Sequence, residues 1–353
     1  MKIELLGKPE VIVSNPYSHQ NYFGWPSAAR LQDGRIAVVC SGFRAEHVCP
    51  FGKACISYSD DNGKTYIGPT PVIDTPLDDR DSGITPFGES SFIITSFNNT
   101  RKLQHEYNPD NKFFHSYLDT VTDEEEKKFI GSEFRITNDL GRTYGEILIS
   151  PVTSPHGPLC LNDGTVLWVG RAFNSENTFK QGEQGIRCYT VDKNGKMEKV
   201  AEIPDIPGGY SCEPHTVQLK DGTLICHIRN DVDFSTWQSE STDSGKSWSD
   251  PHPVLPPHGG APAHLLLHSS GVLMSVYGYR EKPYGIKAMF SFDGGKTWDK
   301  DYRIYENPVS DDLGYPSTIE LDDGTLLTVF YAHPEENSPA VIMQQKWSFK
   351  TEE

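Results

Sequence analysis

The sequence predicts an all-β protein, a six-bladed β-propeller built from four-stranded antiparallel blades. Three observations support this prediction: two short motifs that alternate along the chain, and a high content of turn residues. The 353 residues include 31 glycines and 25 prolines, as many short strands joined by turns require. No linker-like composition interrupts the repeats, so we expect one propeller domain over residues 1–353.

The first motif is a tight hairpin turn followed by an alternating apolar strand. It reads LQDGRIAVV from Leu31, LNDGTVLWV from Leu161, LKDGTLICH from Leu219 and LDDGTLLTV from Leu321, with weaker copies HSSGVLMSV from His268 and FGESSFIIT from Phe87. Asp-Gly suits a two-residue turn, and the β-branched run after it is typical of a strand. Six hairpins at spacings of roughly 40 to 70 residues predict six sheets of four strands.

The second motif falls between copies of the first and reads Ser/Thr-x-Asp-x-Gly-x-Thr/Ser-aromatic. Intact copies begin at Ser59, Thr137, Ser241 and Ser291, and a worn copy begins at Thr190. The Asp carboxylate can accept backbone N–H bonds across the turn, the Gly permits a positive φ, and the aromatic ring packs under the hairpin. Four intact copies are strong evidence for a repeated folding device.

Two segments lie outside the repeats. The N-terminal strand near Ile3–Val13 is expected to close the ring against the last blade. Residues from about 101 to 135 fit neither motif and are interpreted as an insertion in the second blade. Within the insertion, TDEEEKKF is a short helix candidate, because its acids precede its lysines as the helix dipole favours.

Charge and composition exclude several classes of partner. A formal net charge of −17 argues against nucleic acid and anionic membranes, while a local arginine cluster could still bind a small anion. The seven cysteines are irregularly spaced in apolar runs, which favours free thiols over disulfides or a zinc site. The N-terminal residues lack an apolar segment of signal-peptide length and no stretch approaches membrane-spanning length, so we expect a cytoplasmic protein.

Residues at equivalent positions of the repeats should meet at the centre of one face, because the innermost strands of a propeller line its channel. Entry segments of these strands carry Trp25, His156, Glu213, His215 and Tyr315. Exit segments carry Arg44, Arg171, Arg229 and Arg280. Guanidinium groups that converge repel one another unless something anionic lies among them, so this pattern indicates an anionic ligand or protein carboxylates.

The second motif resembles the Asp-box of the sialidase superfamily, and the resemblance covers nearly the whole chain. It implies a propeller that processes an oligosaccharide or glycoconjugate without a metal or another cofactor. In that family a glutamate and an arginine flank one inner strand, as Glu213 and Arg229 do, and a later arginine corresponds to Arg280. A Gly-Tyr pair opens the last blade, as Gly314-Tyr315 does. The resemblance therefore implies that Tyr315 is a nucleophile and Glu213 is its base.

The sequence departs from the family at two places. The first blade opens with Gly24-Trp25-Pro26, where sialidases have Arg-Ile-Pro, so Trp25 offers a stacking face in place of a charge. The acid/base aspartate is absent from the loop after Arg44, where His47 or Glu46 can substitute, and Asp79 in the second blade is a further candidate. The nucleophile half of the site thus resembles a sialidase, and the acid half does not.

Three functions remain open on the sequence. The first is a retaining exo-glycosidase of sialidase type, in which Tyr315 attacks, Glu213 activates it, and His47 or Asp79 protonates the leaving oxygen of a terminal, acidic sugar. Arg44, Arg171, Arg229, Arg280, Trp25, His156 and His215 would bind the sugar. The second is a polysaccharide lyase, or a glycosidase specific for uronate or deoxy sugars, on the same residues. The third is a propeller that binds sugar without catalysis.

Overall fold

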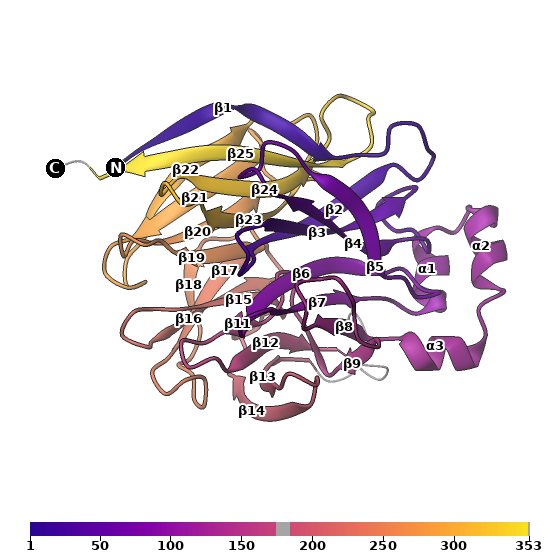
Figure 1. The fold of residues 1–353 in the computed structure, drawn as a ribbon, viewed down its shortest axis with the longest axis horizontal. Coiled ribbons are helices and arrows are strands. Elements are labelled where there is room, and N and C mark those ends of the chain that lie inside the picture. Colours follow the sequence, from indigo (N-terminus) through magenta and orange to yellow (C-terminus); the bar gives the residue numbers. More distant parts are fainter. Residues whose placement is uncertain (174–183, 352–353) are drawn as a thin grey trace.

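The computed structural model describes residues 1–173 and 184–351 and forms the expected propeller of six antiparallel sheets (Figure 1). The first strand of each blade packs against the first strands of its neighbours, so these strands surround the central channel. All seven cysteines are free, as predicted. None of the helices in the described parts of the chain has the length and apolar character needed to cross a membrane.

The first three blades occupy the N-terminal half of the chain. Blade 1 contains β2 (Tyr22–Arg30), β3 (Ile36–Arg44), β4 (Lys53–Ser59) and β5 (Ile67–Ile73). Blade 2 contains β6 (Arg80–Phe87), β7 (Ser91–Phe97), β8 (Ser132–Thr137) and β9 (Leu148–Ser150). Blade 3 contains β10 (Val152–Thr153), β11 (Leu159–Cys160), β12 (Val166–Ala172), β13 (Ile186–Val191) and β14 (Met197–Ile203), and its inner edge is divided because β10 and β11 both pair with β12.

The last three blades complete the ring. Blade 4 contains β15 (Ser211–Gln218), β16 (Leu224–Asn230), β17 (Ser235–Ser241) and β18 (His252–Leu255). Blade 5 contains β19 (Ala263–Leu267), β20 (Leu273–Tyr279), β21 (Gly285–Ser291) and β22 (Asp299–Glu306). Blade 6 contains β23 (Gly314–Glu320), β24 (Leu326–Ala332), β25 (Val341–Lys350) and β1 (Lys2–Val13).

The expected closure of the ring by the N-terminal strand is confirmed. Strand β1 pairs antiparallel with β25 from Lys2 opposite Lys350 to Val13 opposite Ile342, and the two lie side by side in Figure 1. Blade 6 therefore combines strands from the two ends of the chain in one sheet, and this pairing closes the ring.

The insertion of blade 2 forms three short helices between β7 and β8, which project from one side of the molecule (Figure 1). They are α1 (Arg101–Tyr107), α2 (Lys112–Leu118) and α3 (Asp123–Phe129). Thr122 caps α3 through a reciprocal hydrogen-bonded box with Glu125, as its acid-first sequence predicts. The helices end at Phe129 and β8 begins at Ser132, so the insertion is slightly shorter than expected from the sequence.

The second motif acts as a turn lock and as a contact between blades. In the copy at Ser59, Asp61 accepts hydrogen bonds from the backbone N–H groups of Lys64 and Thr65 at 3.0 and 2.9 Å and from the Thr65 hydroxyl at 2.7 Å. The bond from the Thr65 hydroxyl, followed by that from the Thr65 N–H, lowers the pKa of Asp61. The aromatic residue that ends the motif, Tyr66, donates its hydroxyl to Gln344 of blade 6 at 2.8 Å. Similar contacts join Tyr144 of blade 2 to blade 1 and Trp298 of blade 5 to blade 4.

Candidate active site

Four side chains reach the centre of one face from the same position in four different blades. Trp25, Asp81, Glu213 and Tyr315 have φ values of 53°, 47°, 47° and 47°, in the left-handed region that side-chain-bearing residues rarely adopt. Each coincides with a register shift between the first and second strands of its blade. Such bulges re-aim a side chain, so the strain gathers these four groups at one pocket.

The two remaining blades carry proline at this position. Pro155 in blade 3 lies eight residues before Asp163, and Pro262 in blade 5 lies eight residues before Ser270. Asp163 and Ser270 directly precede the hairpin glycine, so the spacing is the same as in the other blades. The proline ring fixes φ near −65°, so neither residue can adopt the left-handed bulge. The pocket is therefore lined by four of these positions and not by six.

Tyr315 and Glu213 form the closest contact in this pocket. The Tyr315 hydroxyl donates to Glu213 Oε1 at 2.5 Å, and Arg229 Nη1 donates to the other carboxylate oxygen at 2.7 Å. Burial, and then the charges of Glu213 and Asp81, raise the pKa of Tyr315 well above its ordinary value. Tyr315 is therefore a neutral phenol at neutral pH, with a carboxylate already placed to accept its proton.

Three guanidinium groups line the pocket, from Arg80, Arg229 and Arg280. Arg229 is held on both sides, because its Nη2 also donates to Asp231 at 2.6 Å. Arg280 Nε donates to the Leu313 carbonyl at 3.0 Å and Nη2 donates to the Tyr331 hydroxyl at 3.3 Å, so its guanidinium is held at the pocket wall. Arg80 lies over the Trp25 ring, 4.4 Å from its centroid.

Trp25 is too buried for the predicted stacking role, which needs an exposed ring face. Its side chain is 2% exposed, and the guanidinium carbon of Arg44 lies 4.9 Å from its ring, in addition to that of Arg80. Little of the indole is left for a sugar. Trp25 lines the pocket and positions Arg80 by cation–π contact.

Asp81 is an acidic group in the pocket without a hydrogen-bond donor among the described residues. Burial, and next the charge of Glu213, raise its pKa to about 7. Arg80 and Arg229 oppose that rise. The pocket therefore contains one carboxylate that binds a proton near neutral pH and another, Glu213, that is engaged by Tyr315 and Arg229.

His47 reaches the edge of the pocket from the loop between β3 and β4. Its Nδ1 lies 3.1 Å from Asp312 Oδ1, and Asp312 also accepts from Tyr22, Tyr331 and His333 at 2.8 to 3.0 Å. Burial lowers the pKa of His47 below its ordinary value, with Asp312 acting against this and Arg80 adding to it. Asp312 thus fixes the ring of His47 and leaves its second nitrogen free to face the pocket.

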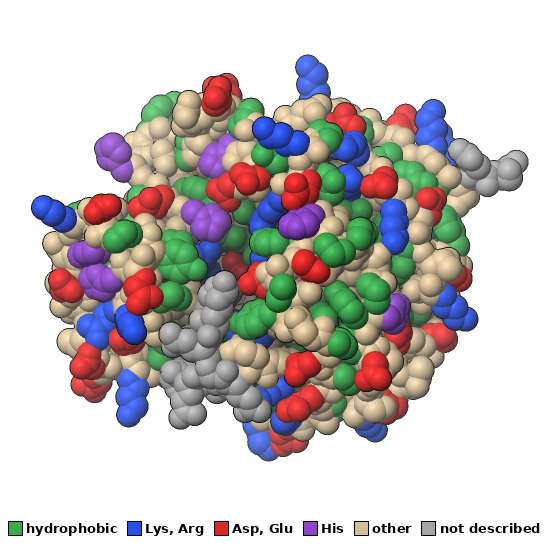
Figure 2. All heavy atoms as spheres, turned by 180° about the vertical axis from the view of Figure 1, so that it is seen from behind, with side chains coloured by type: hydrophobic (Ala, Val, Ile, Leu, Met, Phe, Trp, Pro, Cys, Tyr) green, Lys and Arg blue, Asp and Glu red, His purple; other side chains and the backbone are tan. Residues whose placement is uncertain are grey.

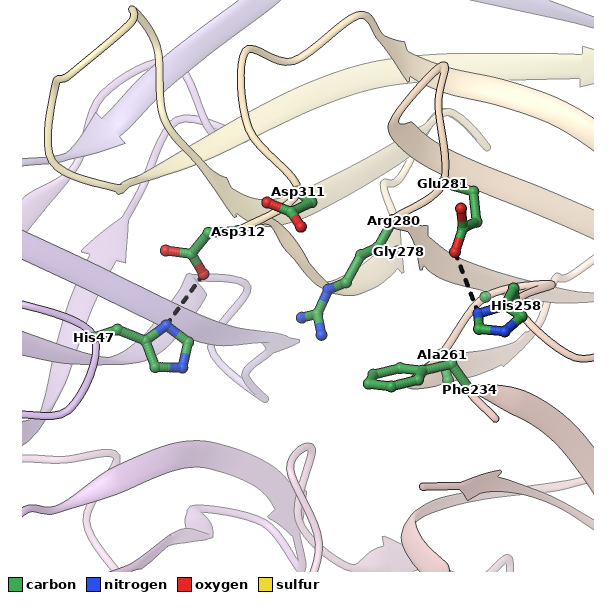
Figure 3. A pocket seen from close by; sticks show the side chains of 10 residues that line it. His47, Phe234, His258, Ala261, Gly278, Arg280, Glu281, Asp311 and Asp312 are labelled. Atoms are coloured by element: carbon green, nitrogen blue, oxygen red, sulfur yellow. Dashed lines mark hydrogen bonds and ion pairs between the residues drawn. The ribbon is translucent and has the colours of Figure 1, made fainter. Parts of the chain in front are cut away.

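Two adjoining cavities make up this face. The smaller one, about 190 Å³ in volume, contains Trp25, Asp81, Glu213, Arg229 and Tyr315, and we call it the central pocket. A larger cavity of about 630 Å³ shares His47 and Arg280 with it (Figure 3). On the face shown in Figure 2, histidine, acidic and basic side chains gather around a hollow near the middle.

Two predicted site residues belong to the protein interior beside the pocket. Arg44 is fully buried and forms an ion pair with Asp78 at 2.6 Å, so its charge is already compensated. Asp79 is also fully buried and accepts two hydrogen bonds from Thr75 at 2.7 Å. Neither lines the central pocket, so the structure does not bring Asp79 or Arg44 together with Glu213 and Tyr315.

Three other predicted binding residues lie away from the central pocket. Arg171 contacts the Tyr210 hydroxyl at 3.1 Å and lies over the Phe173 ring. His156 and His215 lie in the channel with His264, with ring centroids 4.3 to 5.4 Å apart. Burial lowers the pKa of all three histidines well below the ordinary value, so they are neutral. In the described parts of the chain, no group of His, Cys, Asp or Glu side chains has a metal-binding arrangement.

The sequence analysis missed Arg80, Asp81 and Asp312. A signal for Asp81 was present, because Trp25, Glu213 and Tyr315 each lie eight residues before Asp33, Asp221 and Asp323 of the hairpin motif. The same count back from Glu89 of the degenerate copy reaches Asp81. Asp312 had no such signal, because it lies in the loop before β23, outside the repeats.

The fold and this pocket define a six-bladed β-propeller with a polar site at the centre of one face. A model of the family described as BNR repeat-like domain matches residues 136–328, more than half of the chain, so the chain belongs to that family. A search of curated proteins found no match.

Solved structures agree on the fold. A protein of unknown function from Dyadobacter fermentans is 17% identical, with a TM-score of 0.79 and 99% of each chain covered. The NanB sialidase of Streptococcus pneumoniae is 14% identical, with a TM-score of 0.66 over 96% of this chain and 70% of that one. A leech intramolecular trans-sialidase in complex with 2,7-anhydro-Neu5Ac is 13% identical, with a TM-score of 0.67 over 97% and 70%. Two of these three structures are of a sialidase and a trans-sialidase, and at these identities the likeness shows the fold alone.

Proposed function

We propose that this protein is a retaining exo-glycosidase of sialidase type that removes a terminal acidic sugar from a glycan. The observation that carries the proposal is the 2.5 Å hydrogen bond from the Tyr315 hydroxyl to Glu213, inside a pocket lined by guanidinium groups. Binding alone does not require a buried phenol paired with a carboxylate, whereas nucleophilic catalysis does.

The charges around the pocket suit an anionic sugar. Arg229 is engaged by Glu213 and Asp231, so its main part is to hold the base in place. Arg280 and Arg80 have N–H groups directed at the pocket that can bind a sugar carboxylate. A neutral phenol suits this substrate, because a carboxylate nucleophile would be repelled by the substrate's own carboxylate.

The reaction follows from the contacts. Tyr315 Oη attacks the anomeric carbon as Glu213 Oε1 takes the phenol proton, and the bond to the leaving oxygen breaks. Protonated His47 donates its proton to that oxygen. Water then attacks the anomeric carbon of the glycosyl-tyrosine and gives a proton to His47, while Glu213 returns the first proton to Tyr315. Both protons return to their original residues, and the sugar leaves with its anomeric configuration retained.

The first test is release of methylumbelliferone from its α-sialoside and β-glucuronide, with the configuration of the first-formed sugar followed by NMR. We expect turnover of the α-sialoside with retention. Cleavage of the glucuronide alone would place the acidic sugar in a different class. Formation of an unsaturated sugar, detected by its absorbance in the ultraviolet, would identify a lyase and contradict the proposal.

The pH dependence tests the role of His47. Since burial lowers its pKa below the ordinary value of 6.5, the imidazolium is lost while the pH is still acidic, so the fall of kcat/KM with rising pH should be centred below pH 6.5. In His47→Gln this alkaline limb should disappear, with a loss of roughly 10²–10⁴-fold for a sugar leaving group. Methylumbelliferone is a better leaving group and needs less protonation, so its release should fall less.

A matched variant separates His47 from the other proton-binding group of the pocket. Asp81→Asn should keep the alkaline limb that His47 causes. If the limb instead stays in His47→Gln, lies near pH 7, and disappears in Asp81→Asn, then Asp81 supplies the proton, since burial and Glu213 raise its pKa to about 7. That result would contradict the assignment of His47 and leave the Tyr315–Glu213 pair unaffected.

A further inference from the structure

The channel of the propeller contains a ring of six residues, one from the inner edge of each blade, two positions after the residue of the bulge. The ring consists of Ser27, Gly83, Gly157, His215, His264 and Ser317. A strand advances about 3.3 Å per residue, so this ring lies roughly 7 Å further along the channel than Glu213 and Tyr315. His156 of blade 3 joins the two histidines of the ring, with centroid distances of 5.4 and 5.0 Å.

The two histidines of the ring make the same contact with the blade that follows. The Leu265 N–H donates to His215 Nδ1 at 2.9 Å, and the Thr318 N–H donates to His264 Nδ1 at 3.4 Å. A neutral imidazole that accepts at Nδ1 carries its proton on Nε2. His215 and His264 therefore present Nε2–H donors to the channel, and neither of these groups has a partner among the described residues.

His156 adds a third nitrogen that lacks a protein partner. Its Nδ1 lies 2.9 Å from the Ser27 hydroxyl. Its side chain is 3% exposed, and its Nε2 is buried without a hydrogen-bond partner in the described parts of the chain. A buried polar nitrogen costs free energy unless a ligand or water bonds to it. Three such nitrogens on neighbouring rings indicate a site for one small ligand.

The hydrogen bonds at Nδ1 favour a hydrogen-bond acceptor over a metal ion. An Nε2 that binds a metal has no proton, so the ring carries its proton on Nδ1 and donates it to a carbonyl or a carboxylate. At His215 and His264 the bond has the opposite direction, because Nδ1 accepts from a peptide N–H. These two rings are stacked, with centroids 4.3 Å apart and planes inclined by 23°. Two neighbouring N–H donors match the two oxygens of a carboxylate.

The three histidines line one end of a cavity of about 420 Å³, which we call the axial pocket. This volume lies within the usual range of about 300–1,000 Å³ for ligand sites. Its other lining residues mostly follow the histidines along the first strands, and they include Ile84, Leu159, Leu265, Leu266, Leu267 and Ile319. None of the described lining residues is Asp, Glu, Lys or Arg, although the protein has a formal net charge of −17. The axial pocket thus combines N–H donors at one end with apolar walls and has no carboxylate that would repel an anion.

We propose that the axial pocket binds a small monocarboxylate, whose oxygens accept hydrogen bonds from the histidines and whose apolar body packs against the leucine and isoleucine walls. A carboxylate that accepts two or three N–H bonds stays ionised in a buried site. The axial pocket and the central pocket have no described lining residue in common. This inference therefore does not depend on the glycosidase function.

The test uses benzoate as the probe and benzyl alcohol as its neutral match. By calorimetry we expect a dissociation constant below about 1 mM for benzoate, as an efficient ligand of this size allows. Benzyl alcohol should bind at least about tenfold more weakly, because hydrogen bonds to a charged group are the stronger ones. In protein labelled with ¹⁵N-histidine, benzoate should shift the Nε2 signals of His156, His215 and His264. The signals of His47, at the edge of the central pocket, should not move.

A matched pair of variants tests the donors. His215→Asn/His264→Asn keeps an oxygen acceptor near the place of each Nδ1 and removes each Nε2–H, so the affinity for benzoate should fall at least about tenfold. The control is His268→Asn, outside the axial pocket. His268 is 8% exposed, as His264 is, and its Nδ1 also accepts from a backbone N–H, that of Ser270 at 3.1 Å. This variant should bind benzoate as the wild-type protein does.

Several results would overturn the proposal. They are equal affinity for benzoate and benzyl alcohol, unchanged affinity in the double variant, and benzoate-induced shifts at His47 without shifts at the three channel histidines. Absence of benzoate binding up to about 10 mM would also overturn it and would leave the three nitrogens to water. If the double variant does not fold, the spectra and affinities of the wild-type protein with the two probes still decide.

Discussion

Replacing Tyr315 with Phe should lower kcat by at least about 10³-fold and leave the binding of substrate nearly unchanged. The substitution removes only the hydroxyl, and the ring keeps its packing against Trp25 and Tyr331, with centroids 6.4 and 6.1 Å away. Steady-state kinetics on the methylumbelliferyl sialoside would give kcat, and calorimetry with 3′-sialyllactose would give the dissociation constant.

A matched control and a chemical trap sharpen this prediction. Tyr58→Phe also removes a partly buried hydroxyl, the one bonded to Tyr144 at 3.0 Å, but far from the pocket, and should leave kcat unchanged. A fluorinated sialoside that slows the second step should add one glycosyl group to Tyr315 in the wild-type protein, located by peptide mass spectrometry. Full activity of Tyr315→Phe, or a label on another residue, would exclude Tyr315 as the nucleophile.

Replacing Asp78 with Ala should lower the free energy of unfolding by about 3–5 kcal/mol, because it leaves the Arg44 guanidinium buried without its counter-charge. Both side chains are fully buried, 2.6 Å apart. Arg44 also donates to the His47 carbonyl at 2.9 Å, so the substitution should loosen the loop that carries His47 and reduce kcat as well. Urea denaturation followed by tryptophan fluorescence measures the stability.

Two further variants test whether the loss of stability in Asp78→Ala comes from the unpaired buried charge of Arg44. Asp322→Ala breaks the exposed ion pair with Arg30 and should cost less than about 1 kcal/mol. Arg44→Leu/Asp78→Leu removes both buried charges and should be more stable than Asp78→Ala, because no charge is left unpaired. A loss below about 1 kcal/mol in Asp78→Ala would mean that water reaches Arg44 once the carboxylate is gone.

The architecture could be predicted because its signals are local. Each hairpin dipeptide and each Asp-box carries within a few residues the groups that form its turn, as Asp61 does with Lys64 and Thr65. The helix α3 was predictable for the same reason, since Thr122 and Glu125 cap it within one turn. The other two helices also begin after capping residues, Thr100 and Asn111, but neither has an acidic residue in its first turn, and α2 packs its aromatic rings against Phe51 of the loop between β3 and β4.

The site was predictable only where chemistry follows the repeat. Glu213 and Tyr315 occupy one position of the repeat, Arg229 and Arg280 lie at or just after the end of the second strands of their blades, and all four line the pocket. Arg44 also lies at the end of a second strand, but Asp78, which precedes the next blade, neutralises it in the interior. That contact joins side chains of two different blades, and no local pattern encodes it. Asp312 is equally hidden, because its four donors come from three separate segments of the chain.

The four left-handed bulges also separate what the scaffold needs from what the chemistry needs. Trp25, Asp81, Glu213 and Tyr315 differ in size, charge and polarity, yet their backbones are nearly superimposable in φ. The backbone at these positions is therefore the same for four very different side chains, and of the residues found there only proline prevents it. These positions can carry different side chains while the surrounding strands keep their pairing. A propeller of this kind can acquire a new reaction by exchanging a few residues around its axis, and designers could screen these positions as a compact combinatorial library.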